Sequence, residues 1–183
     1  MDVPPAPSDQ VFIERLADRA LEMEIEPLGL LLHDCVQAGA SVGFVLPFSR
    51  EEATTFWRDR VLPAVQSGST LLWVARLGAG VVGTVQLGLA AITNQAHRAD
   101  VAKLLVHPDA RRRGIARRLT RELEAEAARL GRTLLTLDTR TGDVAEPLYR
   151  ALGYETVGTI PGYCRHPSED RLEATTLMYK RLA

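Results

Sequence analysis

The sequence predicts a single α/β domain in which helices flank a mixed β-sheet. Three observations predict this fold class. Apolar, β-rich runs alternate with helical stripes along the chain, a glycine-rich turn joins two neighbouring runs, and residues 101–130 pass from an apolar run directly into a long amphipathic helix. Alternating strands and helices indicate an α/β fold, and a hairpin adds antiparallel pairing to its sheet. The 183 residues suffice for one domain with a sizeable core.

The N-terminal part is predicted to contain a lead-in, a strand and a helix. Residues 1–9 include three prolines and little apolar content, which predicts a flexible lead-in before a single domain over residues 10–183. The short apolar run at residues 11–13 predicts a first strand. Apolar side chains then recur every three or four residues across residues 17–38, which predicts a helix with a break or kink at Pro27.

The middle of the chain is predicted to contain a loop, a capped helix and a hairpin. Residues 39–43, GASVG, indicate a loop whose first interpretation is a linker. Ser49 is a hydroxyl N-cap ahead of acidic residues and predicts a helix that ends at Pro63. Two β-rich runs, residues 71–77 and 81–91, are separated by a Gly-Ala-Gly turn, which indicates a hairpin. The alternation within the second run is typical of a strand with one buried face.

The C-terminal half continues the alternation of strands and helices. The expected elements are a strand over residues 99–107, a helix over 114–130, a strand over 133–137, a helix over 144–152, and closing strands over 154–160 and 175–179. Gly131 and Gly153 stand directly after the two helices, where glycine commonly ends a helix.

The stretch from residue 101 to residue 130 predicts an anion-binding site. The apolar run at residues 104–106 has the length of a buried strand, and Pro108 ends it. A helix follows whose first turn begins within residues 112–116. The first N–H groups of a helix have no partner within it, the helix dipole is positive there, and Gly114 lets a ligand approach the backbone. A phosphate group is the natural ligand for such a site.

Two other phosphate-binding motifs do not fit the sequence. The chain has no G-x-x-x-x-G-K-[ST] loop. Gly78, Gly80 and Gly83 have the spacing of a G-x-G-x-x-G fingerprint, but they join two strands instead of a strand and a helix. On composition alone, residues 111–113 are interpreted as a solvated basic turn.

Charge and cysteine content exclude some functional classes. The formal net charge of −1, from 22 Lys and Arg against 23 Asp and Glu, argues against a non-specific nucleic-acid or membrane binder. Cys35 and Cys164 form no metal motif and are interpreted as ordinary thiols of a reducing compartment, with a disulfide left open. No apolar stretch could span a bilayer, and residues 1–9 lack the apolar segment of a signal peptide. A cytoplasmic protein without a metal site is expected, either a monomer or a homodimer.

Residues 106–116, VHPDARRRGIA, resemble the acetyl-CoA motif of the GCN5-related N-acetyltransferases, the GNAT family, whose core pattern is Q/R-x-x-G-x-G/A. The residues that fill this pattern are Arg111, Gly114 and Ala116. At family spacing follow an apolar strand and residues 148–154, LYRALGY, which are similar to the family's LYxxxGF segment. Further similar segments extend the resemblance to almost the whole chain beyond the lead-in. They also favour residues 39–43 as a loop on the substrate side.

The resemblance implies a central mixed sheet splayed in a V between its fourth and fifth strands, with acetyl-CoA in the V. Backbone groups of the fourth strand would pair with pantetheine amides, and those of the following turn and helix start would hold the pyrophosphate. The residues assigned in this way are Leu104, Leu105, Val106, Arg111, Arg112, Arg113, Gly114, Ile115, Ala116 and Arg117. Gly142 departs from the family, since many members carry there an asparagine that contacts the cofactor. Asp143 is interpreted as a helix cap.

Transfer of an acetyl group from a thioester to an amine needs a neutral amine, stabilisation of an oxyanion, and a proton for the departing thiolate. The sequence has no recognisable nucleophile motif, which favours direct attack by the amine. Tyr149 corresponds to the family tyrosine near the sulfur and is the predicted general acid. Asp100 and Asp138 lie on the strands that would flank the V, where an unpaired carboxylate is costly, so either is a candidate base or counter-ion for the substrate ammonium. The ranking of the two aspartates stays open. A packing role for Tyr149 and a loop-capping role for either aspartate stay open as well.

The predicted function is an acetyl-CoA-dependent N-acetyltransferase that acts on a small-molecule amine, such as an amino-acid-like toxin or antibiotic. One alternative has a protein lysine or N-terminus as the acceptor. Another is a non-catalytic module that senses acyl-CoA or binds nucleic acid through residues 111–113 and 117–118. The near-neutral charge and the lack of interleaved aromatic residues count against nucleic acid.

Overall fold

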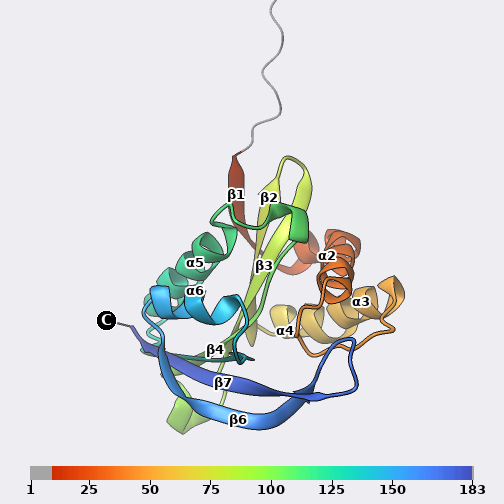
Figure 1. Cartoon of the computed structure of the whole chain (residues 1–183). Coiled ribbons are helices and arrows are strands. Elements are labelled where there is room, and N and C mark those ends of the chain that lie inside the picture. Colours follow the sequence, from red (N-terminus) through yellow and green to blue (C-terminus); the bar gives the residue numbers. More distant parts are fainter. Residues whose placement is uncertain (1–9, 183) are drawn as a thin grey trace, which may run out of the picture.

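The computed structural model describes residues 10–182, so the lead-in predicted for residues 1–9 lies outside the described part (Figure 1). The strands are β1 Val11–Leu16, β2 Thr70–Leu77, β3 Gly80–Leu89, β4 Arg98–Val106, β5 Leu134–Arg140, β6 Glu155–Arg165 and β7 Leu172–Arg181. The α-helices are α1 Asp18–Met23, α2 Ile25–Gln37, α3 Arg50–Phe56, α4 Leu62–Gln66, α5 Ile115–Arg129 and α6 Ala145–Ala151. Shorter turns are the π-helical Trp57–Val61 and the 3₁₀ turns Thr93–Gln95 and Pro108–Ala110. Across residues 10–182 no helix is long and apolar enough to cross a membrane.

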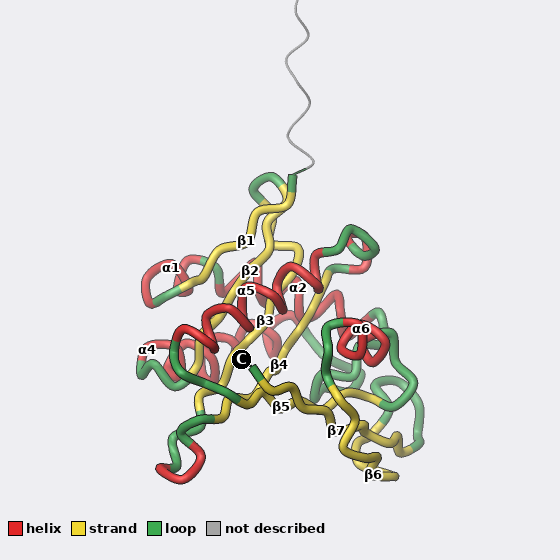
Figure 2. Tube along the Cα trace, turned by 90° about the vertical axis from the view of Figure 1, so that its left-hand side faces the viewer, coloured by secondary structure: helices red, strands yellow, loops and turns green. Residues whose placement is uncertain are grey.

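The described strands form one seven-stranded sheet in the order β1-β2-β3-β4-β5-β7-β6. Neighbouring strands are antiparallel except β4 and β5, which run parallel. The parallel pairing is short and ends where Asp100 stands opposite Thr136. Beyond that point the two strands diverge, and β5, β7 and β6 extend away from the first four strands (Figure 2). The mixed sheet is therefore splayed in a V between its fourth and fifth strands, as predicted.

Helices cover both faces of the central strands. In Figure 1, α5 and α6 lie on one side of β3 and β4, and α2, α3 and α4 lie on the other. The apolar cluster on the α5 side includes Leu119 and Val85, whereas the cluster on the α2 side includes Trp57 and Leu72. The alternation in β3 predicted a single buried face, but residues 83–87 are all buried because both faces of this strand are covered.

Two prolines do not end helices where the sequence predicted. The helix expected over residues 17–38 is two helices that meet at Glu24, and Pro27 lies in the first turn of α2. The second helical segment continues past Pro63, which occupies the first turn of α4. Pro27 is tolerated because its missing N–H would have no intrahelical partner in a first turn. Pro63 directly follows the π-helical turn Trp57–Val61, where the regular α-helical hydrogen bonding is already interrupted. The closing strands β6 and β7 are longer than predicted, since they pair with each other as a hairpin.

Candidate active site

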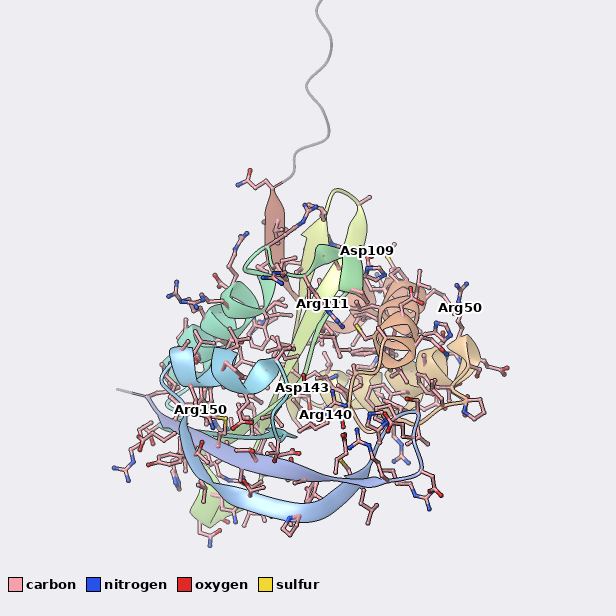
Figure 3. All side chains as sticks on the ribbon, viewed as in Figure 1. Arg50, Asp109, Arg111, Arg140, Asp143 and Arg150 are labelled. Atoms are coloured by element: carbon pink, nitrogen blue, oxygen red, sulfur yellow. The ribbon has the colours of Figure 1, made fainter. Side chains whose placement is uncertain are left out.

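The divergence of β4 and β5 opens a cleft of about 690 Å³, within the usual range for small-molecule sites. Figure 3 shows Arg111, Arg140 and Asp143 around this space, between α6 and the segment that carries α2 and α3. We call the part lined by residues 104–116 and α6 the cofactor end. We call the part lined by residues 39–43, the end of β5 and the β6–β7 hairpin the acceptor end.

A bulge in β4 shapes the boundary between the two ends. The register with β3 shifts at Lys103, which leaves two residues of β4 opposite one residue of β3. Lys103 has a φ of +50°, in the left-handed region that non-glycine residues seldom occupy. Before the bulge Val101 packs into the α5-side cluster, and after it Leu105 packs into the α2-side cluster. Since β5 no longer pairs with β4 beyond Asp100, the backbone on that side of residues 101–106 has no strand partner and faces the cleft.

The start of α5 has the geometry expected of an anion site at the cofactor end. Gly114 is the N-cap residue, in the left-handed conformation with a φ of +74°, and no side chain caps the helix. The first backbone N–H groups of α5 are therefore not capped by a side chain. A Cβ added to Gly114 would meet no atom within 4 Å, so the space beside the backbone is open. Together with the unpaired edge of β4, this start of α5 fits the pantetheine and pyrophosphate of acetyl-CoA.

The residues predicted to bind the cofactor gather at this end in two groups. Those that line the cleft are Leu104, Leu105, Val106, Arg111 and Ala116. Those in the turn and the first turn of α5 are Arg112, Arg113, Gly114, Ile115 and Arg117. Ile115 is buried in the core, so only its backbone can reach a cofactor. The guanidinium of Arg111 donates to the carbonyl of Val106 at 3.3 Å, which places this side chain along the unpaired edge of β4.

Tyr149 lies on α6 and lines the cleft, although only 5% of the residue is exposed. Its ring packs edge-on against the ring of Tyr154, with the centroids 5.3 Å apart. Burial raises the pKa of Tyr149, and the nearby carboxylate of Asp138 raises it further. The phenol therefore keeps its proton at neutral pH, which suits a group that donates a proton.

The structure separates the two aspartates that the sequence could not rank. Asp138 lines the acceptor end and accepts a hydrogen bond from the hydroxyl of Thr175 at 3.1 Å. Asp100 lies at the closed end of the V, outside the residues that line the cleft. Its carboxylate accepts hydrogen bonds from Arg98, at 2.8 Å, and from the hydroxyl of Thr136. Asp100 is already paired with a guanidinium and does not line the cleft, whereas Asp138 does. Asp138 is therefore the better placed of the two candidate bases.

Sequence reasoning missed Lys103, which lines the acceptor end from the bulge of β4. Its Nζ donates to the carbonyl of Val42 at 2.8 Å and lies 5.7 Å and 5.4 Å from the ring centroids of Phe44 and Phe56. Burial lowers the pKa of Lys103, and the negative charge of Asp138 opposes that shift. The loop over residues 39–43 is thereby attached to β4.

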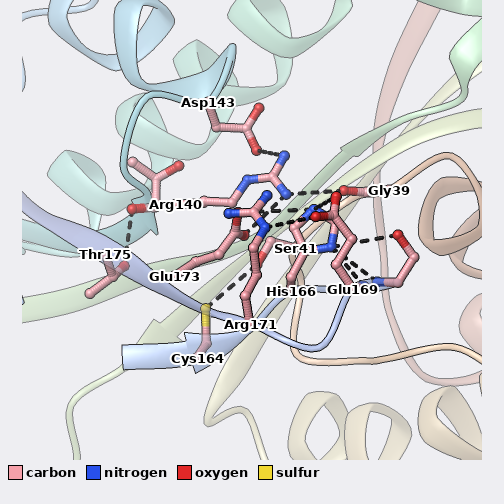
Figure 4. Close-up of polar contacts among 12 residues, drawn as sticks. Gly39, Ser41, Arg140, Asp143, Cys164, His166, Glu169, Arg171, Glu173 and Thr175 are labelled. Carbon is pink, nitrogen blue, oxygen red and sulfur yellow. Dashed lines mark hydrogen bonds and ion pairs between the residues drawn. The ribbon is translucent and has the colours of Figure 1, made fainter. Parts of the chain in front are cut away.

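Sequence reasoning also missed Arg140, which holds the acceptor end together (Figure 4). Its guanidinium donates to the carbonyl of Gly39 at 3.4 Å and contacts the carboxylates of Glu173 at 3.3 Å and Asp143 at 2.9 Å. Asp143 also accepts from the N–H of Val144 at 2.6 Å. Asp143 therefore caps the turn before α6, although Val144 is the N-cap residue itself. Asp143 lies three residues after Arg140, but Gly39 and Glu173 come from distant parts of the sequence, so the local sequence did not identify Arg140 as a link across the acceptor end.

The β6–β7 hairpin contacts the loop on the opposite side of the cleft. The N–H of Leu46 donates to the carbonyl of Pro167 at 2.7 Å, and the hydroxyl of Ser41 lies 3.8 Å from the sulfur of Cys164. Cys35 and Cys164 are both free thiols. Burial raises the pKa of Cys35 to about 11. A thiol that stays protonated is a poor nucleophile, which agrees with the direct attack predicted from the sequence.

The chain is similar in sequence and in fold to known acetyltransferases. Residues 68–156 match the family model of the acetyltransferase (GNAT) domain. An N-acetyltransferase of Azospirillum brasilense, named for the hisH-hisA intergenic region, is 38% identical over 140 residues, which cover 75% of this chain and 80% of that protein. An N-acetyltransferase from Staphylococcus aureus Mu50 has a TM-score of 0.77 at 15% identity, covering 95% of this chain and 99% of that chain. For yncA from Salmonella typhimurium, solved with its cofactor acetyl-CoA, the TM-score is 0.73 at 16% identity, with 94% of each chain covered.

Proposed function

The chain belongs to the GNAT family of acetyl-CoA-dependent N-acetyltransferases, and on that premise we propose that it acetylates the amine of a small molecule by direct transfer in a ternary complex. The observation that supports a small acceptor is that two sets of contacts join the loop to the β6–β7 hairpin across the acceptor end. Arg140 joins the loop at Gly39 to Glu173 on β7, and Leu46 joins the same segment to the hairpin at Pro167. A protein segment would have to break these contacts to enter, whereas a small amine fits inside the cleft.

Different residues of the cleft bind the cofactor, remove a proton from the acceptor and donate a proton to the leaving group. Bound acetyl-CoA supplies the acetyl thioester, and the backbone of residues 104–106 and the start of α5 hold it. Asp138 takes a proton from the acceptor ammonium, directly or through a water molecule, because it lies in the acceptor end with its carboxylate oriented by Thr175. Tyr149 faces the cleft with its phenol protonated and supplies a proton to the thiolate that leaves. Asp100, which was the other candidate base, would act as a more distant negative charge.

The overall transfer balances without a covalent enzyme intermediate. An N–C bond forms and a C–S bond breaks. The ammonium nitrogen loses two protons as it becomes an amide, of which one ends on the free thiol and the other in solvent. A neutral amine is the nucleophile in this scheme, so the first of these protons has to leave before attack.

Two segments of the acceptor end favour an amino-acid-like toxin or antibiotic as the acceptor. Residues 39–44, GASVGF, and residues 161–164, PGYC, resemble the corresponding segments of the tabtoxin resistance protein, a GNAT acetyltransferase. Both segments supply residues to the lining of the cleft.

A screen of amines tests this proposal. The purified chain is incubated with acetyl-CoA and single amines, which include amino acids, aminoglycosides and polyamines, and released thiol is followed in real time. Mass spectrometry then identifies the acetylated product. A second set contains lysine peptides and peptides with free N-termini. We expect thiol release and an N-acetyl product with at least one small amine and with none of the peptides. Acetylation of peptides alone would overturn the proposal.

A further inference from the structure

The acceptor end contains a cation without an acidic partner. The ion pairs formed within residues 10–182 do not include Lys103, whose one hydrogen bond in this part of the chain goes to the neutral carbonyl of Val42. Arg140, on the other side of the acceptor end, is instead paired with Asp143 and Glu173. Among residues 10–182, Lys103 is thus a cation of the acceptor end that forms no ion pair, although the charge of Asp138 acts on it from across the cleft.

The surroundings of Lys103 hold the ammonium group at the cleft but do not use all of its hydrogen-bond donors. The ammonium lies near the aromatic rings of Phe44 and Phe56 and donates to the carbonyl of Val42. An ammonium has three N–H donors, of which Val42 uses one. A cation that is largely removed from water is costly unless an anion approaches it. The two remaining donors and the unbalanced charge are therefore suited to a carboxylate that arrives with the acceptor.

The opposite wall of the acceptor end carries the complementary charge. Asp138 stands on β5, and Lys103 stands on β4, at the point where these two strands have already diverged. The two groups do not form an ion pair with each other, so both charges remain available to a molecule between them. Such a molecule would present its amine to Asp138 and an anionic group to Lys103.

We infer that Lys103 binds a carboxylate of the acceptor, which makes the acceptor an amino acid or an amino-acid-like compound. This inference rests on the proposed function, and it adds to the amino-acid-like acceptor proposed there the residue that recognises it and the requirement for a free carboxylate. Lys103 is a specificity-determining residue in this view: it positions the acceptor while Asp138 takes the proton.

Matched pairs of acceptors test the role of Lys103. Serine is compared with ethanolamine, histidine with histamine and ornithine with putrescine, so that each pair differs only in the carboxylate. Each amino acid is also compared with its carboxamide. The steady-state KM and kcat for the acceptor are measured with acetyl-CoA saturating, and the Kd for acetyl-CoA is measured by calorimetry.

Three variants separate a charge role from a structural one. Lys103→Met removes the charge at similar length, and Lys103→Arg keeps it. Lys180→Met is the matched control, because Lys180 also lies over an aromatic ring, 5.6 Å from the centroid of Tyr154, but outside the residues that line the cleft. Thermal unfolding of each variant shows whether it is folded.

The wild-type chain is expected to prefer the acid in every pair that it acetylates. In Lys103→Met the KM for acids should rise about ten- to hundredfold, as for the loss of a hydrogen bond to a charged group, while the KM for the partners without a carboxylate stays the same. Lys103→Arg should retain part of the preference, and Lys180→Met all of it. If the wild type uses acids and carboxamides equally well, the inference is overturned and the proposed function stands. The same holds if Lys103→Met raises the KM for acids and for carboxamides by the same factor. If no small amine is acetylated, the proposed function fails and the inference fails with it.

Discussion

The two ends of the cleft are built in different ways. The cofactor end is lined by α6 and by one continuous stretch, residues 104–116, which runs from the unpaired edge of β4 into the start of α5 and offers backbone groups to a ligand. The acceptor end consists of side chains from segments far apart in the sequence, such as Lys103, Asp138 and Arg140, and of the loop at residues 39–43. Backbone donors depend on chain conformation, whereas side-chain contacts depend on residue identity. Substitutions should therefore act through backbone geometry at the cofactor end and through charge at the acceptor end.

The largest effect is expected from Asp138→Asn. The amide cannot take a proton from the acceptor ammonium, so kcat/KM for the acceptor should fall about a hundred- to thousandfold at neutral pH. The matched control is Asp100→Asn, which changes the same group on the neighbouring strand but outside the cleft lining, and which should reduce kcat/KM less than about tenfold. Steady-state kinetics of both variants decide between the aspartates. A larger loss in Asp100→Asn would reverse the assignment.

The next largest effect is expected from Tyr149→Phe. This substitution removes the hydroxyl that we propose as the proton donor but keeps the ring that packs against Tyr154. The kcat should fall about a hundredfold, while the Kd for acetyl-CoA measured by calorimetry stays within about twofold. A weakened Kd with little change in kcat would show that Tyr149 binds the cofactor and does not act as an acid.

The pH profile of the wild type gives a second test of the same residue. Burial and the charge of Asp138 both disfavour the phenolate, so they raise the pKa of Tyr149 above its ordinary value near 10. Because the phenol stays protonated, kcat should show no decrease as the pH rises through that ordinary value. A decrease there that is absent in Tyr149→Phe would mean that the phenol titrates normally.

The same contrast explains how much of the site the sequence could predict. Gly114 and the start of α5 were predictable because an anion site at a helix start is encoded locally, by one glycine after a strand and a turn. Lys103 was not, because its exposure to the cleft depends on a bulge that exists only once β3 and β4 are paired. Asp100 and Asp138 could be named from their strands, but their ranking depends on where the pairing of β4 with β5 ends.

The fold itself shows a similar division. The alternation of strands and helices predicted the α/β sheet, and Ser49 was correctly identified as an N-cap, since its hydroxyl accepts from the N–H of Glu52. The burial of both faces of β3 could not be read from its alternating pattern, because it depends on helices from two distant segments. Pro63 was interpreted as the end of a helix, but the helical segment continues through it. The π-helical turn that precedes Pro63 makes this possible, and the sequence pattern did not reveal that turn.

A smaller effect is expected from Gly114→Ala at the cofactor end. The added methyl group disfavours the left-handed conformation and intrudes on the space beside the backbone donors, so the Kd for acetyl-CoA should rise about tenfold. Gly131→Ala is a close control: Gly131 also has a positive φ, of +70°, and no atom within 4 Å of an added Cβ, but it follows the far end of α5. Both variants should lose about 1–2 kcal/mol of unfolding free energy. Only Gly114→Ala should bind acetyl-CoA less tightly, as measured by calorimetry.

The smallest effect on catalysis is expected from Arg140→Met at the acceptor end. The substitution releases Gly39 from β7, but Glu173 keeps a contact with Arg171 at 3.0 Å and the N–H of Leu46 still bonds to the hairpin. The acceptor KM should therefore rise only about threefold, with the Kd for acetyl-CoA unchanged and the free energy of unfolding lower by about 1–3 kcal/mol.

Arg150→Met is the control for Arg140→Met, because the ion pair of Arg150 with Glu146 lies within α6 and Arg150 does not line the cleft. It should leave the acceptor KM unchanged. If Arg140→Met also admits lysine peptides that the wild type rejects, the contacts of Arg140 exclude protein acceptors, and the two ends of the cleft differ in function as well as in construction. If the wild type accepts those peptides equally well, the contacts across the acceptor end do not select for small molecules, and the contrast between the two ends is limited to how they are built.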